Sequence, residues 1–173
     1  LISRKTTQVM GVDSCSIYLL QSDDERLLLQ ATTGLDPQAI GRAQLRMGQG
    51  LTGWAARHET PVAVRDAAAD PRFKLLPETH EKGLRSLAAV PLTSQGRVIG
   101  AMNVQTAGPH DFEADALELL SLIGDLAAGA LEKAALYDSM RRQIQELSTL
   151  AEVSQAVTSP LYLDEMLGVV VDM

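Results

Sequence analysis

Three glycines at fixed spacing, Gly48, Gly50 and Gly53, are the residues of this sequence that most directly suggest chemistry. They spell G-x-G-x-x-G, the pattern whose backbone amides hold the pyrophosphate of a dinucleotide at the start of a helix. That chemistry needs a buried parallel strand before the glycines and a long crossover helix after them. Here residues 42–47 alternate with Arg and Gln, and the segment "ETP" at 59–61 closes a short helix. We therefore interpret Gly48 and Gly50 as turn residues and Gly53 as a close contact between helix and sheet.

The other reactive side chains do not form a catalytic or metal-binding pattern. The histidines are scattered without the spacing of paired metal ligands, and the sequence contains no Walker loop and no motif-supported Ser-His-Asp arrangement. The single cysteine, Cys15, cannot form an intrachain disulfide, which fits a reducing compartment. We therefore predict no catalytic residue and no metal ligand in this segment.

The composition indicates a globular chain with an aliphatic core. Hydrophobic residues make up 46% of the 173 residues but aromatic residues only 3%, so the core must be built from Leu, Ala, Val, Ile and Met. The formal net charge is -7, which argues against a nucleic acid or an anionic membrane as a partner. No apolar run reaches the ~18 residues that a membrane-spanning helix needs. We expect a cytoplasmic location.

Periodicity predicts an α+β fold whose antiparallel sheet is built from hairpins. Strand patterns occupy residues 15–21, 27–34, 43–47, 61–64, 86–94 and 97–106, and helical patterns occupy 1–10 and about 51–58. The strands cluster as hairpins between helices instead of alternating with long helices, and this order favours an antiparallel sheet. Residues 66–83 form a long polar connection, which in a compact domain is usually functional or partly mobile.

A long helical pattern begins near residue 112 and meets no proline before Pro160. One apolar stripe of this helix suits packing on a sheet. A second stripe follows a heptad, with interruptions, through Leu119, Leu122, Leu126, Leu136, Met140, Leu147, Leu150 and Val157. A heptad stripe is the pattern of a coiled coil, so we expect a homodimer through this C-terminal helix. The alternative is a helix that folds back on its own domain.

Two segments, "GQGLTGWAARHETPVAVRDAAADPRF" and "GLRSLAAVPLTSQGRVIGAMNVQ", together resemble a GAF domain. The resemblance covers about residues 1–135. It implies a GAF/PAS-like central antiparallel sheet with helices on both faces, plus the long C-terminal helix. It also implies a sensory or dimerisation module of a multidomain signalling protein, with small ligands bound over one face of the sheet.

The ligand classes of that family can be compared with this sequence, and the cofactor stays unknown. Members that bind cyclic nucleotides usually show Asn-Lys and then Phe-x-x-x-Asp-Glu. Here Asn103 is followed by Val104, and Phe112 is not followed by the acidic pair, which puts a cyclic nucleotide in doubt. Cys15 lies on the first predicted strand, the wrong place for covalent attachment of a bilin.

We expect any ligand pocket between the sheet and the 66–85 connection. The resemblance and the residue types suggest seven ligand-binding side chains: Trp54, Arg72, Phe73, Leu76, Arg85, Ser86 and Met102. Two guanidinium groups near an apolar cavity could bind a carboxylate or a phosphate. The alternatives are a surface ion pair of each arginine with Asp70, Glu78 or Glu81, and simple core filling by the apolar candidates.

The resulting prediction is a signal-input module with three parts. Residues 1–135 form the GAF domain with a truncated first helix, 136–158 a connecting coiled-coil-like helix, and 159–173 the start of a following domain. We expect the module in a bacterial tandem-GAF sensor histidine kinase of a two-component system, with the signalling domain downstream in cis. One alternative is a ligand-free structural dimerisation domain. Another is a methionine sulfoxide reductase-like enzyme, which a single cysteine argues against.

Overall fold

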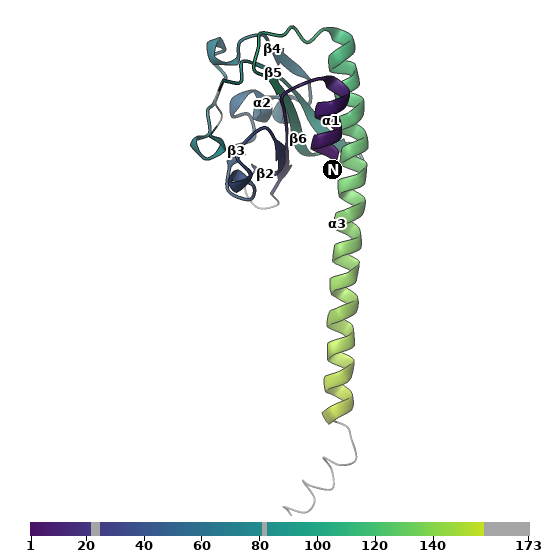
Figure 1. Ribbon diagram of the computed structural model, residues 1–173. Coiled ribbons are helices and arrows are strands. Elements are labelled where there is room, and N and C mark those ends of the chain that lie inside the picture. The colour runs from purple at the N-terminus through teal and green to yellow at the C-terminus, as the bar shows by residue number, and fades with distance from the viewer. Residues whose placement is uncertain (22–24, 81–82, 158–173) are drawn as a thin grey trace, which may run out of the picture. The chain divides into compact units, whose positions relative to one another are not determined.

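The computed structural model describes residues 1–21, 25–80 and 83–157, and the chain forms two units, Leu1–Leu131 and Glu132–Met173. The first unit holds the sheet and its covering helices (Figure 1). The second is described only as the helical residues 132–157. The predicted start of a following domain at 159–173 lies outside the described residues.

A six-stranded antiparallel sheet forms the centre of the first unit, in the order β3-β2-β1-β6-β5-β4. The strands are β1 (Ser14–Leu20), β2 (Arg26–Thr33), β3 (Gln44–Arg46), β4 (Val62–Val64), β5 (Ser86–Ser94) and β6 (Arg97–Thr106). The helices are α1 (Ile2–Met10), α2 (Gly50–His58) and α3 (Ala114–Val157), with single 3-10 turns η1 (Pro37–Ala39), η2 (Ala67–Ala69) and η3 (Pro77–Thr79). The predicted α+β fold class is confirmed.

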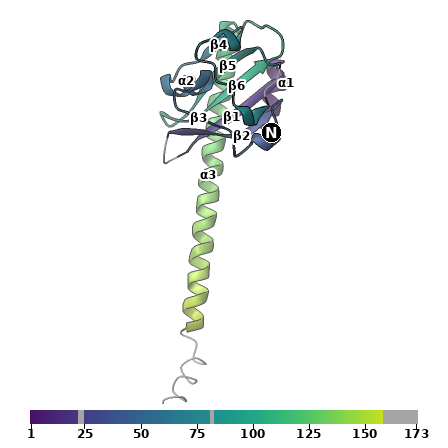
Figure 2. The same cartoon turned by 90° about the vertical axis from the view of Figure 1, so that its left-hand side faces the viewer.

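Helices cover both faces of the sheet because the central strands bury both. Cys15, Ile17 and Val104 pack in one cluster with Leu120 and other residues of α3. Tyr18, Leu29 and Ala101 point to the opposite side, toward α2 and the connections. This division follows from the period of two along a strand. Figure 2 shows α2 in front of the sheet and α3 behind it.

The three glycines serve the turn from β3 into α2. Gly48 and Gly50 have φ angles of +86° and +67°, a region that residues with a side chain rarely adopt. At Gly53 an added Cβ would lie 2.5 Å from the carbonyl oxygen of Arg46, so the helix is pressed against the end of β3. β3 pairs antiparallel with β2, and α2 has 9 residues. The interpretation of these glycines as turn and packing residues is confirmed.

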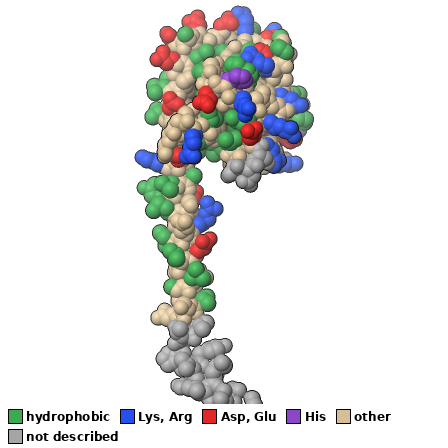
Figure 3. Space-filling view, turned by 180° about the vertical axis from the view of Figure 1, so that it is seen from behind, with side chains coloured by type: hydrophobic (Ala, Val, Ile, Leu, Met, Phe, Trp, Pro, Cys, Tyr) green, Lys and Arg blue, Asp and Glu red, His purple; other side chains and the backbone are tan. Residues whose placement is uncertain are grey.

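Helix α3 presents an apolar face to the sheet in its first part and exposed apolar side chains in the second unit. Leu120, Ala127 and Ala128 are buried against the sheet. In the second unit the exposed apolar side chains are Leu136, Tyr137, Met140, Ile144, Leu147, Leu150 and Val153. Figure 3 shows hydrophobic side chains exposed along this helix. None of the helices in the described part of the chain is long and apolar enough to cross a membrane.

Candidate functional site

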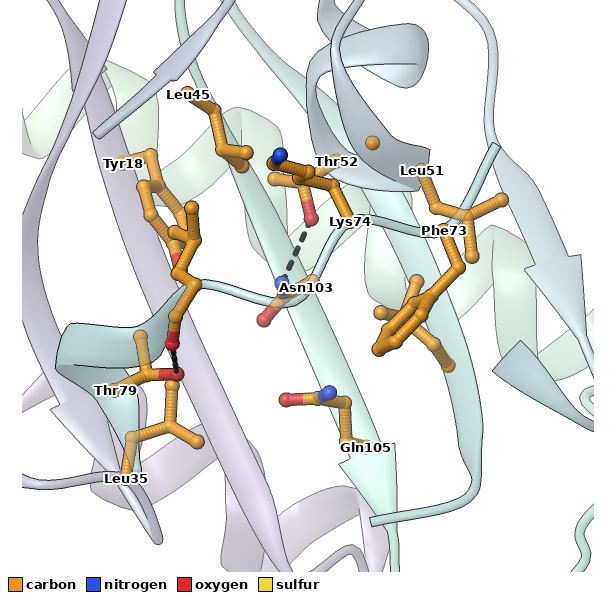
Figure 4. A pocket seen from close by; sticks show the side chains of 13 residues that line it. Tyr18, Leu35, Leu45, Leu51, Thr52, Phe73, Lys74, Thr79, Asn103 and Gln105 are labelled. Carbon is orange, nitrogen blue, oxygen red and sulfur yellow. Dashed lines mark hydrogen bonds between the residues drawn. The ribbon is translucent and has the colours of Figure 1, made fainter. Parts of the chain in front are cut away.

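A hollow of about 20 Å³ lies on the α2 side of the sheet, closed by the connection that carries η3 (Figure 4). Its volume is of the order of one water molecule. The lining residues are Tyr18, Leu35, Leu45, Gly50, Leu51, Thr52, Phe73, Lys74, Leu76, Thr79, Leu87, Asn103 and Gln105. They come from the sheet, the loop after β2, helix α2 and the connection, so the hollow exists only once these four parts have assembled.

Strand β6 supplies the polar floor of this hollow. Asn103 and Gln105 alternate with residues that face α3, so both point to the α2 side, where they are 4% and 2% exposed. Thr52 reaches the floor from the first turn of α2, close behind Gly50. The tight glycine turn therefore sets the distance between the helix and β6, and with it the position of the threonine hydroxyl.

The Asn103 side chain has one satisfied and one unsatisfied end. Its Nδ2 donates a hydrogen bond of 2.7 Å to Thr52 Oγ1. Its Oδ1 is the one buried side-chain oxygen or nitrogen in the described residues without a hydrogen-bond partner. Leaving such an acceptor unpaired costs about 1–3 kcal/mol. An amide held in this way is prepared to accept a hydrogen bond from a bound molecule.

Arg72, together with Asp70 and Trp54, forms a cluster that we call the arginine clasp, and it holds the 66–85 connection over α2. The Nε and Nη2 atoms of Arg72 donate to the two carboxylate oxygens of Asp70 at 2.9 Å and 2.8 Å. The guanidinium carbon lies 4.9 Å from the ring centroid of Trp54, which stacks on His58 on its own helix. These hydrogen bonds from Arg72 hold the pKa of Asp70 below its usual value, although partial desolvation opposes the shift. The clasp thus joins the connection to α2 beside Phe73.

Replacement of Asp70 by Asn should make the stability of the domain less sensitive to acid. Because the folded-state pKa of Asp70 is lowered, its contribution is present above the unfolded pKa and is lost as the pH falls below about 4. We expect Asp70→Asn to cost up to about 1 kcal/mol at pH 7, because its half-buried ion pair with Arg72 joins neighbouring residues of one segment. Urea denaturation at pH 7 and pH 3 measures this difference. The difference in unfolding free energy between the variant and the parent chain should shrink at the lower pH. Asp125→Asn on the exposed side of α3 is the control. An equal difference at both pH values would contradict this role of Asp70.

A second attachment holds the far end of the connection. His80 Nδ1 lies 2.8 Å from Asp36 Oδ2, and the Asp36 amide donates to the carbonyl of Thr79 at 3.1 Å. The hydrogen bond from the Gln38 amide, followed by that from His80, lowers the pKa of Asp36. The segment over the hollow is therefore held at one end by the contact of Arg72 with Trp54 and at the other by the pair of His80 with Asp36.

The structure brings together only some of the side chains predicted to bind a ligand. Phe73 and Leu76 line the hollow, and Trp54 and Arg72 form the clasp beside it. Met102 is fully buried on the α3 side of β6, because adjacent strand residues face opposite ways. Whether the lining residues bind a ligand stays a prediction.

Two further predicted residues hold the connection in place. Arg85 donates from Nε and Nη2 to Asp66 at 3.1 Å and 3.0 Å, so its guanidinium pairs with a neighbouring carboxylate. Ser86 Oγ donates to the carbonyl of Arg65 at 2.7 Å and accepts from the amide of His110. Both residues therefore have structural partners outside the hollow.

The polar floor was not among the predicted binding residues. Five residues that line the hollow were not predicted to bind a ligand: Tyr18, Thr52, Lys74, Asn103 and Gln105. The available signal was the position of Asn103 and Gln105 inside a strand that is otherwise apolar, since a polar side chain buried in a sheet needs a partner.

Comparison with known proteins identifies the family to which these features belong. Residues 2–132 match the profile of the family described as GAF domain. The chain is 26% identical over 155 residues to the Nif-specific regulatory protein of Herbaspirillum seropedicae, covering 87% of this chain and 28% of that protein. It is 31% identical over 83 residues to the phosphoenolpyruvate-dependent phosphotransferase system protein of Escherichia coli, covering 48% of this chain and 11% of that one. The chain thus spans a minor part of both relatives.

Solved structures show the same fold. The GAF domain of an Acinetobacter phosphoenolpyruvate-protein phosphotransferase is 29% identical, with a TM-score of 0.70 over 80% of this chain and 82% of that chain. The GAF domain from the Coxiella burnetii phosphotransferase ptsP is 23% identical, with a TM-score of 0.74 over the same 80% of this chain and 82% of its own. The second comparison supports the fold alone.

Proposed function

Since this chain belongs to the GAF domain family, we propose that it is a signal-input module that binds a small molecule in the hollow over β6. The observation that carries the proposal is the buried, unpartnered Oδ1 of Asn103 beneath a connection that Arg72 joins to Trp54 and His80 joins to Asp36. A ligand that completes this hydrogen bond and displaces the connection would change the packing around α2. The signal then passes along α3 to a domain further along the same polypeptide.

The exposed heptad of the second unit supports a homodimer as the path of the signal. Leu136, Met140, Leu147 and Leu150 follow heptad spacing and are each more than half exposed. Exposed leucines in such a row favour pairing with a second copy of the helix. A ligand can act through the dimer only if it binds one helix arrangement more tightly than another.

The host that we propose is a bacterial multidomain signalling protein in the cytoplasm. The match over 87% of this chain to a Nif-specific regulatory protein favours a regulatory protein as the host. The sensor histidine kinase expected from the sequence, with tandem GAF domains, stays a second prediction.

We propose no catalytic activity for this segment. Cys15 is fully buried on the α3 side of β1, while the hollow lies on the other side of the sheet. Burial raises the pKa of its thiol to about 12, so the nucleophilic thiolate is scarce at neutral pH. An assay for turnover of free methionine sulfoxide should give no product above the buffer rate. Measurable turnover that is lost in Cys15→Ala would contradict the proposal.

The melting temperature of the whole chain tests the sensor function. A bound ligand at 100 times its dissociation constant stabilises a protein by about 2.7 kcal/mol, which raises the melting temperature by several degrees. We expect at least one compound of a broad panel of small metabolites to produce such a shift in a saturable way. A panel without any binder would favour the ligand-free dimerisation domain instead.

A further inference from the structure

We propose that the hollow selects a small molecule whose buried end is uncharged and donates a hydrogen bond, namely a primary amide or a hydroxyl group, to Oδ1 of Asn103. This inference rests on the proposed sensor function and names the ligand class of the same site. It excludes carboxylates and ketones as the buried group. Three features of the hollow support it: the direction of the hydrogen bond, the charge of the walls and the distribution of apolar surface.

The direction follows from how the Asn103 amide is held. Its Nδ2 donates to Thr52 Oγ1 at 2.7 Å, and with the amide in this orientation its carbonyl oxygen is the end left without a partner. The end without a partner is therefore the carbonyl oxygen, which has lone pairs and no hydrogen to give. A ligand group at this position must bring an N–H or an O–H. A carboxylate or a ketone would place lone pairs against lone pairs.

The walls exclude a charged group at the same position. Among the residues that line the hollow, all of which are described, Lys74 alone carries a charge, and it is exposed. An ammonium group could donate to Asn103 but would meet no carboxylate among the lining side chains. Burial of a charge without a partner is costly. A neutral donor satisfies Asn103 without that cost.

The apolar surface limits the remainder of the molecule. Leu45, Leu51 and Phe73 lie around the polar floor (Figure 4), and Leu76 also lines the hollow. A short branched hydrocarbon group therefore suits the space beside the donor. The hollow now has a volume of about 20 Å³, so any such ligand must displace part of the connection. The connection is held at one end by the contact of Arg72 with Trp54 and at the other by the pair of His80 with Asp36, and contacts of these kinds are individually weak. Ligand entry is thereby coupled to release of the connection.

Asparagine-selective NMR tests this inference directly, because Asn103 is the only asparagine of the sequence. A chain labelled with ¹⁵N asparagine gives one side-chain amide signal, which reports on the contact itself. The probes are isobutyramide, 3-methylbutan-2-ol, isobutyrate and 3-methylbutan-2-one, which share one carbon skeleton at the apolar end. We expect the amide and the alcohol to shift the signal in a saturable way. The carboxylate and the ketone should bind at least about tenfold more weakly, since each lacks the donor.

Variants separate ligand binding from folding. Asn103→Leu removes the acceptor together with the hydrogen bond to Thr52 Oγ1. Loss of the unsatisfied oxygen is therefore offset by a buried hydroxyl that loses its amide partner, and the melting temperature should change little. The same variant should lose the melting shift that isobutyramide gives. Ile17→Val on β1 points to the α3 side and is the control. It should lower the melting temperature slightly and leave the isobutyramide shift unchanged.

The outcomes distinguish this inference from the proposed function. If isobutyrate or the ketone binds as tightly as the amide, the ligand class is wrong and the sensor function stands. If Asn103→Leu still binds isobutyramide, the ligand does not bind at Asn103 and this inference is wrong. If none of the four probes binds, the class inference fails, and the metabolite panel alone then decides the proposed function.

Discussion

Gly53→Ala is expected to destabilise the domain by about 3 kcal/mol, although alanine is ordinarily the better residue in a helix. The added Cβ would lie 2.5 Å from the carbonyl oxygen of Arg46 and 3.3 Å from the amide nitrogen of Gly48. Both neighbours are backbone atoms, which cannot move aside as the tip of a side chain can. The helix must therefore shift, and the Thr52 hydroxyl shifts with it.

Gly129→Ala provides the matched control, because it makes the same chemical change in a different environment. Gly129 lies in α3 with nothing within 4 Å of an added Cβ. Its replacement should stabilise the helix by about 0.5–1 kcal/mol. Urea denaturation at one fixed protein concentration, followed by circular dichroism, measures both variants. Equal stability of Gly53→Ala and the parent chain would show that the close contact is not needed.

The paired substitution Leu147→Asp with Leu150→Asp should convert the expected dimer into a monomer. The two leucines are 67% and 65% exposed on the helix of the second unit, so their loss costs the single chain little. In a coiled coil they would be buried on both helices, where loss of a leucine costs about 2–5 kcal/mol. We expect the dimer dissociation constant to rise at least about 100-fold. Sedimentation equilibrium measures it.

A control pair carries the same added charge on another side of this helix. Gln145→Asp with Ser148→Asp lies outside the heptad stripe and should leave the dimer intact. If both pairs dissociate the dimer, charge rather than the leucine stripe decides assembly. A parent chain that sediments as a monomer would refute the homodimer altogether.

The sequence predicted the strands better than the site. Hairpin patterns gave the antiparallel sheet because turn residues and apolar runs are local signals. The faces of β6 were not predictable in this way, because Gly100 through Thr106 are all buried and no exposed residue marks the period of two. Met102 was therefore predicted to line the ligand pocket, although it lies on the face of β6 opposite to Asn103.

For the two arginines, the residue type suggested a role but did not identify the partner. Their side chains suggested anion recognition, but the choice between a ligand and a neighbouring carboxylate depends on distances that only the folded chain defines. Arg72 pairs with Asp70, an alternative that the sequence had left open, and Arg85 pairs with Asp66. Short polar side chains such as Thr52 carried no such signal, yet they form the floor of the hollow.

The stacking of Trp54 gives this domain a built-in optical reporter. Its indole is the only one in the chain, and it lies between the guanidinium of Arg72 and the imidazole of His58. Departure of Arg72 would leave one side of the ring to solvent, and indole emission is sensitive to polarity and to nearby cations. Opening of the connection can therefore be followed in real time by intrinsic fluorescence, with no dye attached and no residue changed.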